Sequence, residues 1–318
     1  MRRSLLALAW TLGCTRFEAA ERQPIDGSAA QDAGQPDAQG EGGLPTADAC
    51  DSDAPFGAPE VVALSTDADE SAMRVSADGL AFYVSKGPIA GGESDLFVAR
   101  RQARTDPIPS GAALQLLPTL SASGEDKRPT VTPNETEIYF ESNRPGTAGS
   151  YDIWMALRNA DGTWTAPSPA PDLNGGAEDR EPYLLPASGA VIYFSSNREG
   201  ASTIYRSARK TPAGWTLPVK VLGLPSGIEH SSPAVTEDEL TIYFAMAPGG
   251  SDRDIYVARR SAKTEPFGPA VAVEGVNTQD EDRPTSVSAD GCTVYFTSIR
   301  RGTGPAGYNL FGATRTKR

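Results

Sequence analysis

The chain has 318 residues, with 29 Lys and Arg against 41 Asp and Glu, and its net charge of −12 argues against a role in binding nucleic acid, where many cations must replace phosphate counterions. Hydrophobic residues make up 39% of the chain beside 32 Gly and 26 Pro, a composition that suits many short strands and turns. No run of about 18 apolar residues occurs, which excludes a multi-span membrane protein.

Residues 1–14 have the pattern of a secretory signal. Arg2 and Arg3 form a short basic start, residues 5–10 are apolar, and the segment ends in Gly13-Cys14. This ending resembles a bacterial lipobox, in which the signal is cleaved before a Cys that is then lipidated. We therefore expect lipidation at Cys14, with a plain signal peptide cleaved elsewhere as the alternative.

Residues 15–54 are predicted to be a disordered tether. They hold two basic and nine acidic residues and are otherwise rich in Ala, Gly, Gln and Pro, with almost no aromatic or β-branched residues. Such a segment cannot bury enough apolar area to offset the entropy lost on ordering. Behind a lipid anchor, it would hold the remaining residues, 55–318, away from the membrane surface.

From residue 55 onward the chain repeats one motif five times. Clusters of β-branched and aromatic residues, such as 241–244 and 254–257, are bounded by Gly, Pro, Asp and Asn, which is typical of strands. Each copy has a tyrosine in such a cluster, and these tyrosines recur about every 50 residues, near the length of a β-propeller blade. They are Tyr83, Tyr139, Tyr193, Tyr243 and Tyr295.

The repeated pattern P-x-V-S-x-D-G-x-x-x-Y-F-x-S-x-R, followed by D-[IL]-[WYF], resembles the WD40-like repeat of TolB-type β-propellers, which occurs in many bacterial envelope proteins. The resemblance implies an all-β, five-bladed propeller whose four-stranded antiparallel blades run from an inner strand outward. It also implies recognition of a partner through one face. The Asp of the last motif becomes Thr203 in the third copy and Asn309 in the fifth, which argues against catalysis by this Asp.

The two ends of the repeat region predict how the ring closes. Residues 59–64 match the outer strand that precedes each later copy, whereas the chain ends just after the third strand of the fifth copy. We predict that residues 59–64 complete the last blade and cover its open edge. Cys50 precedes this strand and Cys292 lies in the blade that it completes, so a disulfide would pin the closing arm, although sequence alone leaves two free thiols as the alternative.

The acidic residues that open the copies are candidate ligand residues at one mouth of the channel, because they precede the predicted inner strands. With their neighbours they could hold a polar ligand or a hard cation such as calcium. The alternative is that they tie adjacent blades together through backbone donors and arginines. The metal is unknown and no cofactor is expected beyond calcium as one option. The candidates are Glu70, Glu125, Asp126, Arg128, Glu178, Asp179, Arg180, Glu229, His230, Glu281, Asp282 and Arg283.

The other polar and aromatic features favour structural roles. His230 is the only histidine and no G-x-S-x-G motif accompanies it, which argues against a zinc site or a catalytic triad, and we expect it in an exposed loop. Three tryptophans fall at strand positions that suit packing between blades: Trp154, Trp164 and Trp215. The residues of the turns between second and third strands either supply the backbone angles that the turns need or form a recognition surface. They are Asn143, Arg144, Asn197, Arg198, Ile299 and Arg300.

The sequence favours a non-enzymatic binding or scaffolding propeller. We expect a monomeric, outer-membrane-anchored lipoprotein that faces the periplasm or the cell surface, touches the membrane only through its anchor and recognises an envelope protein or a cell-wall component. One alternative is a glycosidase-like hydrolase, which needs two carboxyls in unequal environments, whereas the repeated carboxylates are nearly equivalent. The other alternative is a propeller that binds calcium.

Overall fold

The computed structural model describes residues 50–51, 54–89, 92–121, 124–211, 213–250, 252–288, 290–300 and 307–316. The predicted signal, Cys14 and nearly all of the predicted tether lie outside these residues. The chain divides into Met1–Pro45 and Thr46–Arg318, and every described residue belongs to the second unit. The only helices in the described part are two 3₁₀ turns, Gly111–Ala113 and Pro248–Gly250, and neither is long enough to cross a membrane.

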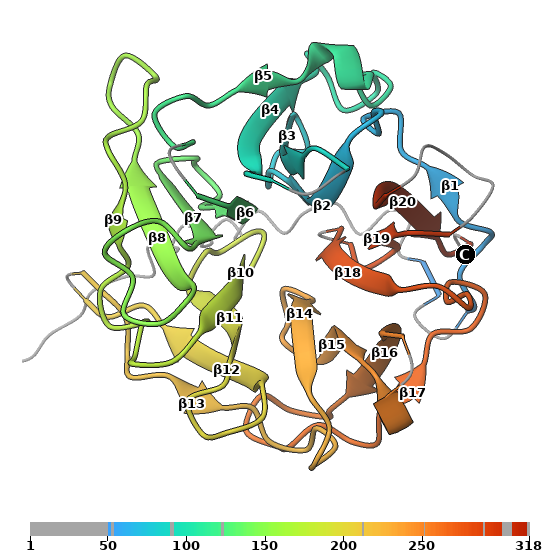
Figure 1. Ribbon diagram of the computed structural model, residues 1–318. Helices are drawn as coiled ribbons and strands as arrows, with labels where there is room; N and C mark the ends of the chain where they lie inside the picture. The colour runs from blue at the N-terminus through green and yellow to red at the C-terminus, as the bar shows by residue number, and fades with distance from the viewer. Residues whose placement is uncertain are drawn as a thin grey trace, which may run out of the picture. The chain divides into compact units, whose positions relative to one another are not determined.

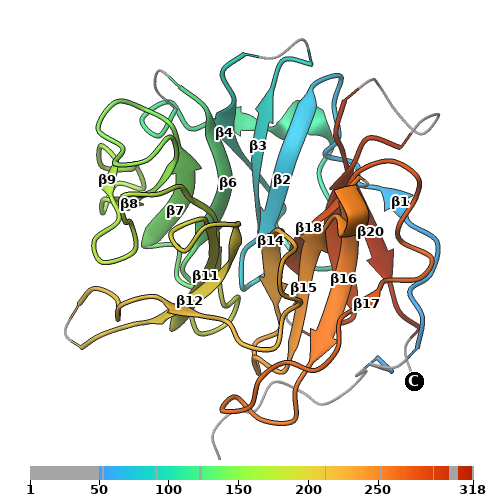
Figure 2. The same cartoon turned by 60° about the horizontal axis from the view of Figure 1, so that its bottom comes forward.

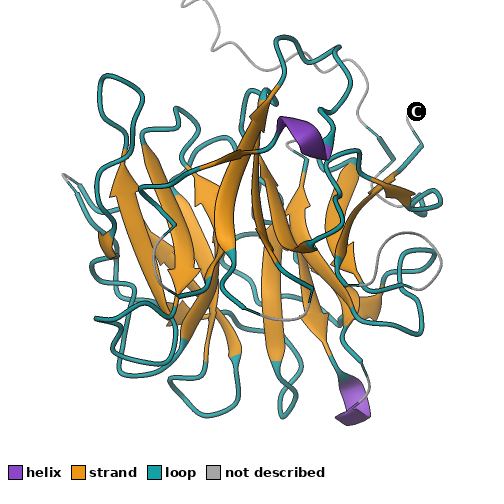
Figure 3. Ribbon diagram, turned by 45° about the horizontal axis from the view of Figure 1, so that its top comes forward, coloured by secondary structure: helices purple, strands orange, loops and turns teal. Residues whose placement is uncertain are grey.

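Five four-stranded antiparallel sheets stand in a ring, which confirms the predicted five-bladed propeller (Figures 1 and 3). Blades 1 to 5 are numbered by their inner strands β2 (Asp69–Val75), β6 (Asp126–Val131), β10 (Asp179–Leu184), β14 (His230–Val235) and β18 (Asp282–Val287). The second strands are β3 (Ala81–Gly87), β7 (Glu137–Ser142), β11 (Val191–Ser196), β15 (Thr241–Met246) and β19 (Thr293–Ser298).

The outermost strand of each blade is much shorter than the other three. The third strands are β4 (Asp95–Arg100), β8 (Asp152–Leu157), β12 (Thr203–Ala208), β16 (Asp254–Arg259) and β20 (Asn309–Thr314). The outermost strands have two residues each: β5 (Gln115–Leu116), β9 (Ser168–Pro169), β13 (Val219–Lys220), β17 (Val271–Ala272) and β1 (Glu60–Val61). Outer edges this short offer little backbone to a second chain.

The N-terminal strand closes the ring as predicted, over a shorter range than residues 59–64. Strand β1 pairs antiparallel with β20, with Glu60 opposite Gly312 and Val61 opposite Phe311, so blade 5 has the order β1-β20-β19-β18 (Figure 1). A disulfide joins Cys50 to Cys292, with 5.5 Å between their Cα atoms. The arm that precedes β1 is thus covalently attached to the blade that β1 completes.

The core lies between neighbouring blades, whose sheets face one another around the ring (Figure 2). Four of the five repeat tyrosines are buried in it, Tyr295 is half-buried beside it, and the phenylalanine next to each tyrosine in the second strands is buried as well. Tyr139 of blade 2, for example, meets Trp215 of blade 3 edge-on at 5.8 Å between ring centroids. Trp154, Trp164 and Trp215 are all buried, as their predicted packing role requires. Each such side chain contributes about 1.5–3 kcal/mol through burial.

The inner strands are irregular at the point where they approach the centre of the ring. Their pairing with the second strands shifts by a residue, for example between Arg180 and Tyr183. At the shift, Arg128, Glu181 and Ser232 have φ values of 54°, 57° and 53°. Left-handed backbone at non-glycine residues costs about 1–3 kcal/mol each and re-aims the side chain of the bulged residue. Three blades therefore direct a polar side chain toward the channel.

Replacing both cysteines, as Cys50→Ser with Cys292→Ser, should lower the free energy of unfolding by about 2–4 kcal/mol, because the bridge spans 242 residues and restricts the unfolded chain. Urea denaturation of both proteins measures the difference. A reductant should bring the wild type to the level of the double variant and leave the variant unchanged. Full stability of the reduced wild type would show that closure does not depend on the bridge.

Candidate functional site

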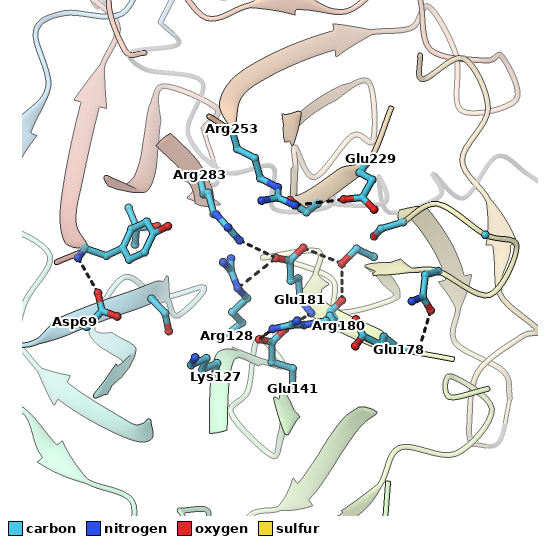
Figure 4. Close-up of a pocket in the computed structure, with 18 residues that line it drawn as sticks. Asp69, Lys127, Arg128, Glu141, Glu178, Arg180, Glu181, Glu229, Arg253 and Arg283 are labelled. Atoms are coloured by element: carbon cyan, nitrogen blue, oxygen red, sulfur yellow. Dashed lines mark hydrogen bonds and ion pairs between the residues drawn. The ribbon is translucent and has the colours of Figure 1, made fainter. Parts of the chain in front are cut away.

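A cavity of about 480 Å³ opens at the mouth of the central channel, on the face where the inner strands begin (Figure 4). We call it the mouth pocket. Its lining holds five acidic and five basic residues: Asp69, Glu141, Glu178, Glu181, Glu229, Lys127, Arg128, Arg180, Arg253 and Arg283. Ser71, Ser195, Asn197, Gly200, Ser202, Ser231, Thr297 and Tyr308 complete it. The pocket is therefore strongly polar but balanced in charge.

Glu181 is the centre of the charged network. Its carboxylate lies 3.5 Å from Arg128 Nε of blade 2 and 3.8 Å from Arg283 Nη1 of blade 5. Ser232 of blade 4 donates its backbone N–H and its hydroxyl to the same carboxylate, and Ser195 of blade 3 donates its hydroxyl at 2.8 Å. Burial acts to raise the pKa of Glu181, but the three neighbouring arginines prevail and lower it to about 2.

A second buried carboxylate holds the next arginine in place. Glu141 is fully buried and accepts hydrogen bonds from Arg180 Nη2 at 3.1 Å and from the backbone N–H of Glu181 at 2.8 Å. The charge of Glu141 raises the pKa of Arg180, whose guanidinium also covers the ring of Tyr151 at 3.9 Å. The inner charges of the pocket are therefore fixed by one another.

The rim of the pocket is more open. Arg253 lies 3.4 Å from both Glu229 and Glu281, and 59% of the Glu229 side chain is exposed. Glu281 accepts hydrogen bonds from Arg283 Nε at 2.9 Å and from the Tyr308 hydroxyl. Burial acts to raise the pKa of Glu281, but Arg283 and these donors lower it. A ligand would meet the rim charges first.

The structure brings only part of the predicted ring to the mouth. Glu178, Glu229, Arg128, Arg180 and Arg283 line the pocket. Glu125 and Glu281 lie beside it, where Glu125 pairs with Lys127 at 2.8 Å. The backbone N–H groups of Glu125 and Glu178 donate to the side-chain oxygens of Asn143 and Asn197. The turn after the second strand therefore also holds the segment that leads into the inner strand of the same blade.

The placement of Asp126, Asp179 and Asp282 at the mouth is wrong. All three are fully buried inside their blades. Each accepts a hydrogen bond from the arginine of the turn after the second strand, at 2.5 Å for Arg144 and 2.8 Å for Arg300, and also from Arg198. Successive residues of a strand point to opposite faces, so an opener and its neighbour cannot both face the channel.

Glu70 is also misplaced, because the copies align one residue differently in the first blade. It stands opposite Lys86 as Asp126 stands opposite Ser142, so Glu70 occupies the buried position and Asp69 takes the place of the opener. Glu70 is fully buried and accepts a hydrogen bond from Thr66 N at 3.0 Å. Burial raises its pKa to about 7.

His230 does not lie in an exposed loop. It occupies the same buried position in blade 4, is 2% exposed, and meets Phe244 edge-on at 5.3 Å. Burial lowers its pKa to about 4, so the ring is neutral at neutral pH. Pro88 and Pro248 stand where the turn arginines of the other blades stand, so blades 1 and 4 lack that cation.

The residues that sequence reasoning missed are Asp69, Lys127, Glu141, Glu181, Arg253 and Tyr308. One signal was present, because Arg128, Glu181 and Ser232 each precede a proline in an inner strand. A proline there removes a donor from the ladder and favours a bulge. The described residues contain no group of three or more His, Cys, Asp or Glu placed to hold a metal ion, so the calcium option gains no ligand set from them.

No family model matches the sequence, and no curated protein matches it. Among solved structures, TolB from Acinetobacter baumannii is 13% identical, with a TM-score of 0.48 over 79% of this chain, which spans 56% of that TolB chain. A thermostable family-43 glycoside hydrolase is 11% identical, with a TM-score of 0.49 over 82% of this chain and 91% of its own. The Coprinopsis cinerea GH62 α-L-arabinofuranosidase is 12% identical, with a TM-score of 0.46 over 78% and 91%. Likenesses this distant say nothing about activity.

Replacing Glu181 by Gln should lower the free energy of unfolding by about 3–5 kcal/mol, because Arg128 and Arg283 would lose their shared carboxylate in a largely buried site. Urea denaturation measures the loss. The matched control is Glu229→Gln, which removes an exposed carboxylate of the same pocket and should stay within about 0.5 kcal/mol of the wild type. Equal effects of the two substitutions would contradict the central role of Glu181.

Glu70 should make the protein less stable as the pH rises. Its folded pKa of about 7 exceeds the ordinary value of 4.5, so its contribution is fully present below pH 4.5 and is lost as the pH rises to about 7. The loss amounts to about 3 kcal/mol. The Glu70→Gln variant should match the wild type near pH 4.5 and exceed it at pH 8, as measured by urea denaturation at each pH. A difference that is constant with pH would rule out this titration.

Proposed function

We propose that this protein is a non-enzymatic binding propeller whose mouth pocket holds a small polar ligand with charges of both signs. The observation that carries the proposal is the balanced set of five acidic and five basic residues around a cavity of about 480 Å³. That volume falls in the range of small-ligand sites rather than of broad protein interfaces. A ligand with both signs of charge can pair with such a lining without leaving a protein charge unpaired.

The electrostatics of the pocket support binding over hydrolysis. A glycosidase needs a carboxyl whose raised pKa keeps it protonated as the general acid. In the described structure, the carboxyls with a raised pKa are Glu70, Asp95, Asp152 and Asp254, and none of them lines the pocket. Glu181, at its centre, has a pKa of about 2 and stays ionised.

The disulfide supports export to an oxidising compartment, where such bonds persist. Together with the signal-like residues 1–14, it supports our placement of the protein in the bacterial envelope, anchored through Cys14. Cell-wall peptide fragments carry free carboxylates and free amines, so they have the chemistry that the pocket would recognise. We therefore take the peptide part of muropeptides as the ligand that the pocket holds.

Calorimetric titration with purified muropeptides should show binding that weakens as the salt concentration rises, since the contacts are ionic. Arg253→Met, which removes a rim cation, should weaken the binding at least tenfold, whereas Arg104→Met, which removes an exposed arginine outside the pocket, should leave it unchanged. A parallel screen of glycosides should give no turnover. Absence of muropeptide binding would overturn the proposal, as would glycoside turnover that Glu229→Gln abolishes.

A further inference from the structure

Beneath the mouth pocket the channel narrows to a cavity of about 20 Å³. Two successive levels of the inner strands surround it. The upper level consists of Ala72, Arg128, Glu181, Ser232 and Pro284, and the lower level of Met73, Pro129, Pro182, Pro233 and Thr285, with Arg74 and Tyr183 below. We call this space the channel cavity. It shares Arg128 and Glu181 with the mouth pocket but is otherwise lined mainly by small and apolar side chains.

Arg74 reaches across the channel into this region. It belongs to blade 1, is 3% exposed, and donates from Nη2 to the carbonyl of Leu184 in blade 3. Its guanidinium lies 3.5 Å from the centroid of the Tyr183 ring. These contacts fix the guanidinium beside the channel cavity, yet its Nη1 is buried and has no hydrogen-bond partner.

Arg74 also lacks a carboxylate partner among the described residues. Glu237 acts on it electrostatically but forms no ion pair with it, and instead accepts a hydrogen bond from Ala187 N at 2.8 Å. Burial lowers the pKa of Arg74, which reflects the cost of removing its charge from water. A buried charge without a partner is strongly unfavourable, so native proteins pair such groups or bind a counterion.

The charges and donors around the channel cavity point to an anion. The charge of Arg128 is compensated by Glu181 at 3.5 Å, whereas the positive charge of Arg74 has no counter-charge in the lining of the cavity. Thr285 adds a second donor, because its hydroxyl is buried without a hydrogen-bond partner and lines the same cavity. Two donors and one uncompensated positive charge therefore face a space large enough for one water-sized particle.

We propose that the channel cavity binds a small monovalent anion, with chloride as the ion available in most surroundings, held by Arg74 Nη1 and the Thr285 hydroxyl. Sulfate, with five heavy atoms, and gluconate are far larger than the single water-sized particle that this space admits. The bound anion supplies the counter-charge of Arg74 and closes the channel below the mouth pocket. The mouth pocket is then a blind pocket rather than the entrance of a tunnel. This inference does not depend on which ligand the mouth pocket binds.

Thermal unfolding in sodium chloride and in sodium gluconate of equal ionic strength tests the proposal. Chloride and bromide should raise the Tm in a saturable way, because an ion that binds only the folded state stabilises it by mass action. Gluconate should not, and sulfate, which is excluded from protein surfaces, should raise the Tm only gradually and without saturation. Crystals grown in bromide should show an anomalous peak between Arg74 and Thr285. Equal Tm values in chloride and gluconate, or a water at that place without an anomalous peak, would overturn the proposal.

Three variants connect the effect to the site. Arg74→Met should abolish the chloride dependence of the Tm. Thr285→Val keeps the arginine and should weaken the apparent chloride affinity at least threefold, so it provides the test if Arg74→Met does not fold. Arg104→Met removes an exposed arginine that also donates to backbone carbonyls, and it should respond to chloride as the wild type does. A full chloride response in Thr285→Val would contradict the site.

Discussion

The buried carboxylate of Glu181 is the contact on which the centre of this propeller depends. Each blade otherwise packs mainly on its two neighbours through apolar side chains, and such packing is non-directional. Glu181 instead joins its own blade 3 to Arg128 of blade 2, Ser232 of blade 4 and Arg283 of blade 5. Since blades 3 and 5 are not neighbours in the ring, the ion pair fixes distances across the channel that blade packing alone leaves free.

A second constraint repeats inside the blades and varies in a coherent way. Blades 2, 3 and 5 bury an aspartate against the arginine of the following turn. In blade 1, Pro88 stands in place of the arginine and Glu70, with a pKa of about 7, in place of the aspartate. In blade 4, Pro248 and His230, with a pKa of about 4, take the same two positions. Both replacements can be uncharged near neutral pH. The site thus accepts a complete ion pair or a neutral group, as the cost of an unpaired buried charge requires.

The fold was readable from the sequence because its evidence repeats. Five copies fix the number of blades, and the unmatched segment before the first copy predicts the closing strand and the position of Cys50 beside Cys292. The site was only partly readable, because it depends on single residues. Because the first copy is shifted by one residue, Asp69 takes the place of the opening glutamate and Glu70 takes the buried position. Because side chains alternate along a strand, Asp126 is buried inside its blade although Glu125 lies beside the pocket. The sequence did not identify Glu181 as a site residue, because its partners lie in other blades, far from it in the sequence.

The difference between inner and rim charges decides how the mouth pocket can recognise a ligand. Glu181 and Glu141 are held by several donors each, so a ligand that displaced them would leave arginines unpaired in a largely buried site. Arg253 is different, because it is shared between Glu229 and Glu281 at 3.4 Å and is 33% exposed. In the complex that we propose, a carboxylate of the ligand would replace one of these two partners, and the freed Glu229 would pair with a ligand amine. Recognition at the rim would then be an exchange of ion pairs, for which the positions of the two ligand charges count for more than the net charge of the ligand.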